Sequence, residues 1–158
     1  MLTQRELKEL VTLLKKISRP KRDLPQPVFD ALIPVLPFIA CELVVTNHRG
    51  EILLTWRDDR YWKGWHFPGG LLRYGESFLH RIRYVARHEL GVRVTRARFL
   101  SVLNYPGAGR GHGVSLVWHC TVDRTPKKGK FFRRMPHGII WEHRRVWKNV
   151  RVTLATME

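Results

Sequence analysis

Three side chains on one predicted helical face carry the first sign of chemistry in this sequence. Val85, His88 and Glu89 are three and four positions apart, so an α-helix over this segment places them side by side. Carboxylates on such a face can hold Mg²⁺ against the charge of a pyrophosphate. Only Glu89 is a carboxylate here, and one carboxylate holds Mg²⁺ weakly unless other oxygen atoms help. Glu89 is therefore a candidate metal ligand, with a solvated helix glutamate as the alternative.

The chain is strongly basic, with 29 Lys and Arg residues, 13 Asp and Glu residues and a formal net charge of +16. Such a charge attracts nucleotides, nucleic acid or acidic lipid headgroups, and it does not choose among them. Residues 124–151 hold ten Lys or Arg and one acid, Glu142, interleaved with aromatic residues. This composition fits a nucleic-acid surface and also a basic rim around a diphosphate pocket. We favour the rim over nucleic acid, because aromatic residues in strands are more often core.

Length and cysteine usage narrow the class of protein. A chain of 158 residues with 44% hydrophobic content can fill one globular core. Cys41 and Cys120 lie in apolar stretches without metal-ligand spacing, which favours reduced core thiols over zinc or a disulfide. Residues 1–20 have no continuous apolar run of the kind found in signal peptides and membrane spans. We expect a cytoplasmic protein without a membrane partner.

The elements that must position these residues begin with an N-terminal arm. Residues 3–17 place apolar side chains at helical spacing and predict an amphipathic helix. The stretch from there to Pro37 holds five prolines and predicts an irregular arm with a short helical turn at residues 28–32. We therefore divide the chain into an arm, residues 1–37, and a domain, residues 38–158.

Within the domain, the pattern predicts strands followed by one helix and then more strands. Residues 38–45 and 51–57 predict a hairpin of buried strands, and WHFPGG at residues 65–70 predicts a short strand that enters a glycine turn. Residues 77–90 predict a helix between an N-cap at Ser77 and a stop at Gly91. Two further strands, residues 92–105 and 114–122, flank the loop PGAGRGHG. This order predicts an α+β sandwich.

The loop and helix at residues 70–92 resemble the signature of the Nudix hydrolases. That signature runs Gly, five residues, Glu, seven residues, Arg-Glu, an aliphatic, any residue, Glu-Glu, any residue, Gly and an aliphatic. The matching positions are Gly70, Glu76, Glu89, Gly91 and Val92. The positions that depart from it are Tyr84, Val85 and His88. The resemblance implies a Nudix-type α/β/α sandwich with a mixed β-sheet and a central loop and helix.

A branch of that family, the GDP-mannose mannosyl hydrolases, is similar over residues 28–122. It also lacks most of the helix glutamates and keeps the last, and it shares WHFPGG and the pattern from Glu42 to Arg57. In that branch water attacks the anomeric carbon of the sugar, and the nucleoside diphosphate leaves. The resemblance implies hydrolysis of a nucleoside diphosphate sugar, with Mg²⁺, or Mn²⁺ in its place, as the cofactor.

The resemblance also implies roles for individual residues. The metal ligands would be the Gly70 carbonyl, Glu89 and Glu142. The residues implied at the substrate are Glu42, Arg57, Arg73 and Tyr105, and Arg57 would also touch the leaving group during catalysis. The general base would be His143, with His137 as its rival. Glu76 would brace the loop against the helix with Arg83 in place of the missing arginine.

Two other functions stay open at this point. One is the ordinary Nudix cleavage at phosphorus, which the lost carboxylates at positions 85 and 88 disfavour because it relies on clustered metals. The other is an inactive Nudix domain that binds nucleotide or RNA through its basic face. The resemblance further implies a homodimer with the N-terminal arm at its interface.

Overall fold

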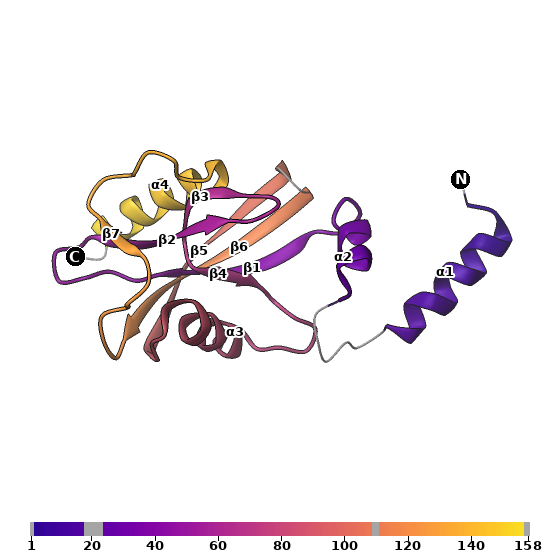
Figure 1. The fold of residues 1–158 in the computed structure, drawn as a ribbon, viewed down its shortest axis with the longest axis horizontal. Helices are drawn as coiled ribbons and strands as arrows, with labels where there is room; N and C mark the ends of the chain where they lie inside the picture. Colours follow the sequence, from indigo (N-terminus) through magenta and orange to yellow (C-terminus); the bar gives the residue numbers. More distant parts are fainter. Residues whose placement is uncertain (1, 18–23, 109–110, 157–158) are drawn as a thin grey trace.

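A computed structural model describes residues 2–17, 24–108 and 111–156 of the chain (Figure 1). The predicted N-terminal helix is present as α1 (Gln4–Lys16), which begins at a capping box formed by Thr3 and Glu6. None of its residues is buried, and its apolar stripe is solvent-exposed. The short helix of the arm is α2 (Gln26–Leu32), which follows Pro25.

Two sheets form the centre of the molecule. The first has the strand order β4-β1-β6-β5, and the second has the order β3-β2-β7. The strands of the first sheet are β1 (Phe38–Val44), β4 (Gly69–Leu71), β5 (Val94–Ala108) and β6 (Gly111–Val122). Those of the second are β2 (Ile52–Asp58), β3 (Lys63–His66) and β7 (Lys130–Phe132). The first sheet is mixed, because β1 pairs parallel to β6 and antiparallel to β4.

Two features of the strands differ from the sequence prediction. The strands β1 and β2 do not form a hairpin, since each belongs to a different sheet and they meet only next to their turn. There the N–H of Leu53 donates to the carbonyl of Val45. The glycine pair at residues 69–70 belongs to strand β4 instead of a turn. Local patterns detect a buried strand but not its neighbour, because pairing depends on distant segments.

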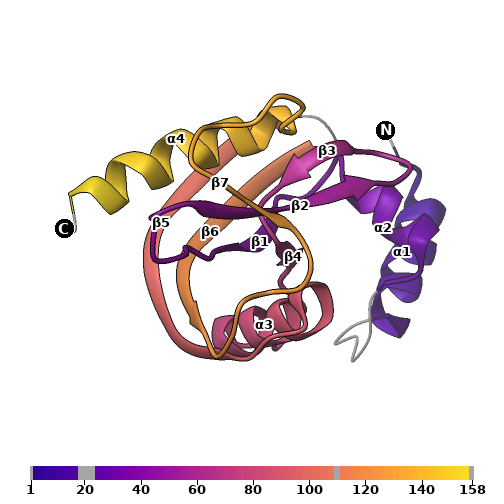
Figure 2. The same cartoon turned by 60° about the vertical axis from the view of Figure 1, so that its left-hand side comes forward.

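The sheets lie between two helical layers (Figure 2). On one side lie α3 (Phe78–Val85) and the π-helical turn η1 (Ala86–Leu90), and on the other lies α4 (Trp141–Ala155). Alternate side chains of β1 reach the two layers. Leu43 packs in the cluster that contains Ile82 of α3, whereas Val44 packs in the cluster that contains Val146 of α4. This confirms the predicted α/β/α sandwich with a mixed sheet.

The predicted helix at residues 77–90 is confirmed, but its last turn is wider than an α-helix. Ser77 caps the start by accepting from the N–H of His80, and Gly91 ends the helix with φ 66°. The π-helical bonding of η1 changes the spacing on which a common face depends. Val85, the last residue of α3, is buried in the core, whereas in η1 His88 is exposed and Glu89 is half-buried.

Among the described helices, none is both long and apolar enough to cross a bilayer.

Candidate functional site

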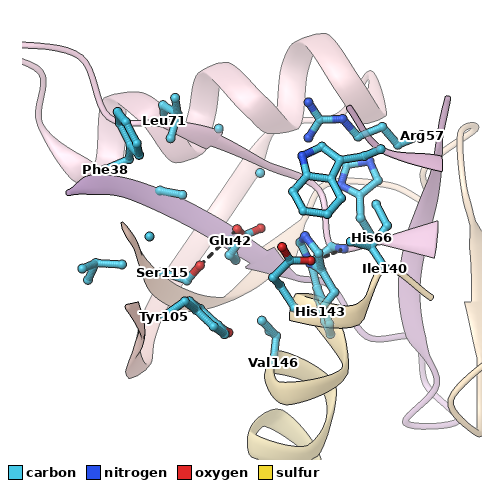
Figure 3. Close-up of a pocket in the computed structure, with 18 of the residues that line it drawn as sticks. Phe38, Glu42, Arg57, His66, Leu71, Tyr105, Ser115, Ile140, His143 and Val146 are labelled. Atoms are coloured by element: carbon cyan, nitrogen blue, oxygen red, sulfur yellow. Dashed lines mark hydrogen bonds between the residues drawn. The ribbon is translucent and has the colours of Figure 1, made fainter. Parts of the chain in front are cut away.

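A cavity of about 300 Å³ opens between the two sheets and the first turns of α4 (Figure 3). Strands from both sheets and the helix α2 form its walls. It brings together most of the candidate site residues predicted from the sequence. Those that line it are Glu42, Arg57, Gly70, Tyr105, Glu142 and His143. The arm therefore takes part in the site, because Phe29 and Ile33 of α2 and its C-cap close one side.

Glu42 lies on β1 with its carboxylate inside the cavity and an exposed fraction of 7% (Figure 3). Its Oε1 accepts from the hydroxyl of Ser115 at 3.3 Å, whereas its buried Oε2 has no hydrogen-bond partner among the described residues. Burial, and next the charge of Glu89, raises the pKa of Glu42 to about 8. A buried carboxyl in this state holds a proton or accepts a cation or a ligand hydroxyl.

The charge of Glu89 acts on this carboxyl, although Glu89 does not line the cavity itself. Burial raises the pKa of Glu89 to about 7, and a hydrogen bond from the backbone of Gly69 opposes the shift. The Cβ of any larger residue at position 69 would collide with the Glu42 carboxylate, so the glycine allows the close approach of β4. Two carboxyls with raised pKa values thus approach the backbone of Gly69.

This donor set fits one divalent cation but not a metal cluster. Nowhere in the described chain do three or more His, Cys, Asp or Glu side chains converge in a way that could hold a metal. The unpartnered Oε2 of Glu42, the carboxyl of Glu89 and backbone oxygens such as that of Gly70 are the oxygen ligands that Mg²⁺ prefers. Val85 and His88 supply nothing to it, because one is buried in the core and the other stacks on Tyr84.

Arg57 supplies positive charge to the cavity. It lies on β2, half-buried, and its guanidinium pairs with Asp59 at the rim. Its charge acts on both sides of the cavity: it partly offsets the rise in the pKa of Glu42 and Glu89, and it contributes, after burial and His66, to the lowered pKa of His143. A guanidinium with this reach can bind the phosphate oxygens of a ligand.

His143 lies in the first turn of α4, and its surroundings do not suit the predicted general base. Its Nδ1 accepts a hydrogen bond from the backbone N–H of Phe67 at 3.2 Å, so the remaining proton of the neutral ring lies on Nε2. Burial lowers the pKa of His143 to about 3. The nearby ring of His66, with a pKa lowered to about 4 by burial, bonds to Thr55. His143 is therefore a neutral hydrogen-bond donor, and the rival His137 is exposed and does not line the cavity.

Glu142 and Tyr105 supply two further polar groups to the cavity wall. The Oε2 of Glu142 is buried and has no hydrogen-bond partner among the described residues, and burial raises the pKa of this carboxyl. The hydroxyl of Tyr105 is likewise buried and without a hydrogen-bond partner in the described chain. The guanidinium of Arg145 lies 5.0 Å from the Tyr105 ring centroid. Unsatisfied buried groups of this kind are expected where a ligand supplies the missing partner.

The brace of the loop is made by a residue that the sequence analysis missed. Glu76 pairs with Arg81 at 2.7 Å, and both side chains are almost fully buried. The predicted partner, Arg83, is exposed. The prediction of Arg83 assumed that Glu76 and Arg83, seven residues apart, lie on one helical face. Glu76 precedes the helix, which begins only at Phe78, so helical spacing does not apply to it. The backbone N–H of Arg73 also donates to Glu76. The guanidinium of Arg73 lies 5.2 Å from the Tyr84 ring centroid, and this predicted substrate residue does not line the cavity.

An α/β/α sandwich with carboxyls, a guanidinium and hydroxyls around a cavity between its two sheets defines a protein with a polar binding cavity. Residues 37–140 match the family model of the NUDIX domain, and the chain belongs to the Nudix hydrolase family. The predicted family is thereby confirmed.

Solved structures share the fold. The MutT Nudix hydrolase of Burkholderia pseudomallei has a TM-score of 0.64 and 22% identity over 73% of this chain and 98% of its own. A Nudix hydrolase of Nitrosomonas europaea has a TM-score of 0.59 and 14% identity over 74% and 90%. The Nudix domain of Shewanella oneidensis NrtR, solved in complex with ADP ribose, has a TM-score of 0.59 and 16% identity over 83% and 99%.

Proposed function

We propose that this Nudix domain hydrolyses a nucleoside diphosphate sugar at the anomeric carbon, releasing the free sugar and an intact nucleoside diphosphate. The observation that carries the proposal is the loss of two of the three metal-binding positions on the helix. Val85 is buried in the core and His88 stacks on Tyr84, at 3.9 Å between ring centroids. Attack at phosphorus relies on clustered metal ions. Attack at carbon needs fewer metal ions, because only the negative charge of the departing diphosphate must be stabilised.

In this proposal each polar group of the cavity has a separate role in binding or catalysis. Arg57 binds the departing diphosphate, and Glu142 removes a proton from the water that attacks the sugar carbon. A buried carboxylate without a hydrogen-bond partner is a stronger base than an exposed one, as its raised pKa reflects. Tyr105 donates a hydrogen bond to a phosphate oxygen, Glu42 accepts one from a sugar hydroxyl, and the neutral His143 donates from Nε2.

One divalent cation completes the proposed site. Mg²⁺ or Mn²⁺ held by Glu89, Glu42 and the Gly70 carbonyl would neutralise charge on the diphosphate as it leaves. The sequence predicted Glu142 as a metal ligand and His143 as the base. Because the Nδ1 of His143 already accepts a hydrogen bond from Phe67, we assign the role of base to Glu142 instead.

The two buried thiols, Cys41 and Cys120, support a cytoplasmic location for this activity.

A second candidate function is cleavage of, or simple binding to, an ADP-ribose-like compound. The observation in its favour is the fold shared with the NrtR Nudix domain, which was solved in complex with ADP ribose. Such a compound also carries a diphosphate between two sugars, so Arg57 would bind the diphosphate in this case too. The two candidates differ in the bond that breaks and therefore in the products.

A product-resolved assay in ¹⁸O-labelled water distinguishes the candidates. The protein is incubated with Mg²⁺ and a panel of nucleoside diphosphate sugars that includes GDP-mannose and ADP-ribose. We expect ¹⁸O in the released sugar and none in the nucleoside diphosphate. Label in a nucleoside monophosphate or a sugar phosphate would replace the proposal with attack at phosphorus. Binding without any product would leave the domain as a nucleotide-binding module.

Variants connect the assay to the cavity. Arg57→Ala should lower kcat/KM at least a hundredfold, because the leaving diphosphate loses its guanidinium. Arg60→Ala is the matched control, since Arg60 is exposed and pairs only loosely with Asp30, at 3.9 Å. Equal effects of the two substitutions would mean that general positive charge, and not the cavity, determines turnover.

A further inference from the structure

A second cavity, of about 510 Å³, lies away from the one described above. Six of its lining residues are arginine or histidine: Arg49, Arg96, Arg98, His119, Arg133 and Arg151. No carboxylate and no Phe, Tyr or Trp is found in its described lining. Guanidinium groups therefore determine the charge of this cavity.

The sheet forms the floor of this arginine cavity. Arg96 and Arg98 are two positions apart on β5, so their side chains leave the same face of the strand. Directly across from them on β6 lie Thr121 and His119. The Nε2 of His119 bonds to the hydroxyl of Thr46 at 3.0 Å. Burial, and next the charge of Arg98, lowers the pKa of His119, so this ring is a neutral part of the floor.

Segments distant in sequence complete the rim. Arg49 lies in the turn between β1 and β2, and Arg133 follows β7 directly. Arg151 lies near the C-terminal end of α4 and donates to the carbonyl of Gly50 at 3.4 Å, which ties the helix to that turn. Figures 1 and 2 both show this end of α4 beside the turn. Three separate elements thus bring guanidinium groups to one opening.

Within the described residues, no carboxylate neutralises the charge of the arginine cavity. None of its five arginines forms an ion pair with a carboxylate of the described chain, whereas Arg93 and Arg124 nearby both pair with Asp123. Like charges that converge without counter-charges repel one another, and an anion relieves that repulsion. The five arginines are exposed, so water screens their repulsion, and the arrangement favours a ligand with several negative charges.

The two cavities are separated along α4. Glu142 and His143 reach the first cavity from the first turn of the helix, and Arg151 reaches the second. Nine residues of α-helix between Glu142 and Arg151 correspond to about 13 Å. A ligand in the arginine cavity therefore need not compete with one in the first cavity.

We propose that the arginine cavity binds closely spaced phosphate groups, as found in polyphosphate anions and in the backbone of single-stranded RNA. Guanidinium groups bind phosphate oxygens in pairs, and five of them match several phosphates at once. Without an aromatic platform the site cannot stack bases, so recognition is independent of sequence. The site is distinct from the proposed hydrolase activity and does not depend on it.

Fluorescence anisotropy with a labelled 12-nucleotide oligouridine, and calorimetry with inorganic tripolyphosphate, test the proposal on the full chain. Arg96→Ala/Arg98→Ala should weaken binding at least tenfold and reduce the salt slope of RNA binding by about 1.4, since each phosphate contact contributes about 0.7. Arg83→Ala/Arg87→Ala, at exposed positions outside both cavities, removes the same charge and should weaken binding less than twofold.

The same measurements distinguish the two phosphate sources. If tripolyphosphate binds and displaces the RNA, the site also accepts small polyphosphates. If the RNA binds and tripolyphosphate does not displace it, the ligand is the nucleic-acid backbone. Arg96→Lys/Arg98→Lys keeps the charge but loses the paired hydrogen bonds, and we expect an intermediate weakening. Equal weakening by both alanine pairs, or no binding of either probe, would overturn the proposal. Turnover of the first-cavity substrate should be unchanged in the Arg96/Arg98 variants.

Discussion

The backbone N–H of Phe67 donates to Nδ1 of His143, which joins the segment between β3 and β4 to the first turn of α4. The two rings also stack, with centroids 6.0 Å apart. One hydrogen bond therefore fixes the tautomer of the histidine and positions the back wall of the cavity. It also occupies the nitrogen that a general base would need.

His143 should consequently act through position and not through proton transfer. With a pKa lowered to about 3, it stays neutral across the range from pH 5 to 8. His143→Asn, which keeps a hydrogen-bond acceptor near Phe67, should leave the shape of the pH profile of kcat/KM unchanged. Glu142→Gln should remove the limb that reports the base. Loss of that limb in the histidine variant alone would restore His143 as the base.

The elements of the fold could be predicted from the sequence because their signals are local. Caps such as Ser77 and Gly91 mark helix ends by interactions within a few residues. Sheet order was not predictable in that way. The pairing of Cys41 with Leu116 and with Gly70 depends on segments far along the chain, and so the hairpin prediction was wrong.

The candidate site shows the same division. The resemblance to the Nudix hydrolases implied most of its residues, and the cavity contains them. Their protonation states could not be predicted, because the surroundings of Glu42 and His143 are set by distant residues such as Ser115 and Phe67. Arg81 was missed because helical spacing does not extend into the loop before the helix.

The carboxyl of Glu42 should make the protein less stable as the pH rises. Its folded pKa is about 8 against an ordinary value of 4.5, so the folded state binds the proton more tightly. The stability from that proton is fully present below pH 4.5 and is lost as the pH rises to 8, by an amount on the order of a few kcal/mol. Urea unfolding at pH 6 and pH 8 should show the loss, and Glu42→Gln should flatten it. An unchanged slope in the variant would assign the pH dependence to other groups.

The buried pair of Glu76 and Arg81 should be the main brace of the loop before α3. Arg81→Ala leaves a buried carboxylate without its partner, and we expect a loss of about 3–5 kcal/mol in the free energy of unfolding. Arg83→Ala is the matched control on the same helix, because Arg83 is exposed, and it should cost less than about 0.5 kcal/mol. Similar losses for both variants would show that the pair is not the brace.

The apolar stripe of α1 should mediate the homodimer proposed from the sequence. Leu10 and Leu14 are exposed by 42% and 41%, and α1 buries no residue against the rest of the described chain. Leu10→Glu/Leu14→Glu, like deletion of residues 1–27, should convert the dimer to a monomer in light scattering. Thr12→Glu/Lys16→Gln, on the polar face, makes an equal change in charge and should leave the dimer intact. A monomeric wild type, or a dimer that survives the deletion, would remove α1 from the interface.

Glu89 should be essential for binding a divalent cation. Burial raises the pKa of Glu89 to about 7, and burial and next the charge of Glu89 raise that of Glu42, so a divalent cation between the two carboxyls would favour their ionised forms. Glu89→Gln should weaken Mn²⁺ binding at least tenfold, measured by electron paramagnetic resonance of the free ion and independently of turnover. Glu9→Gln, on the exposed face of α1, should bind Mn²⁺ as the wild type does. If Glu89→Gln bound Mn²⁺ equally well, the cation would have to lie elsewhere in the cavity, and Glu142 would be the next carboxylate to replace.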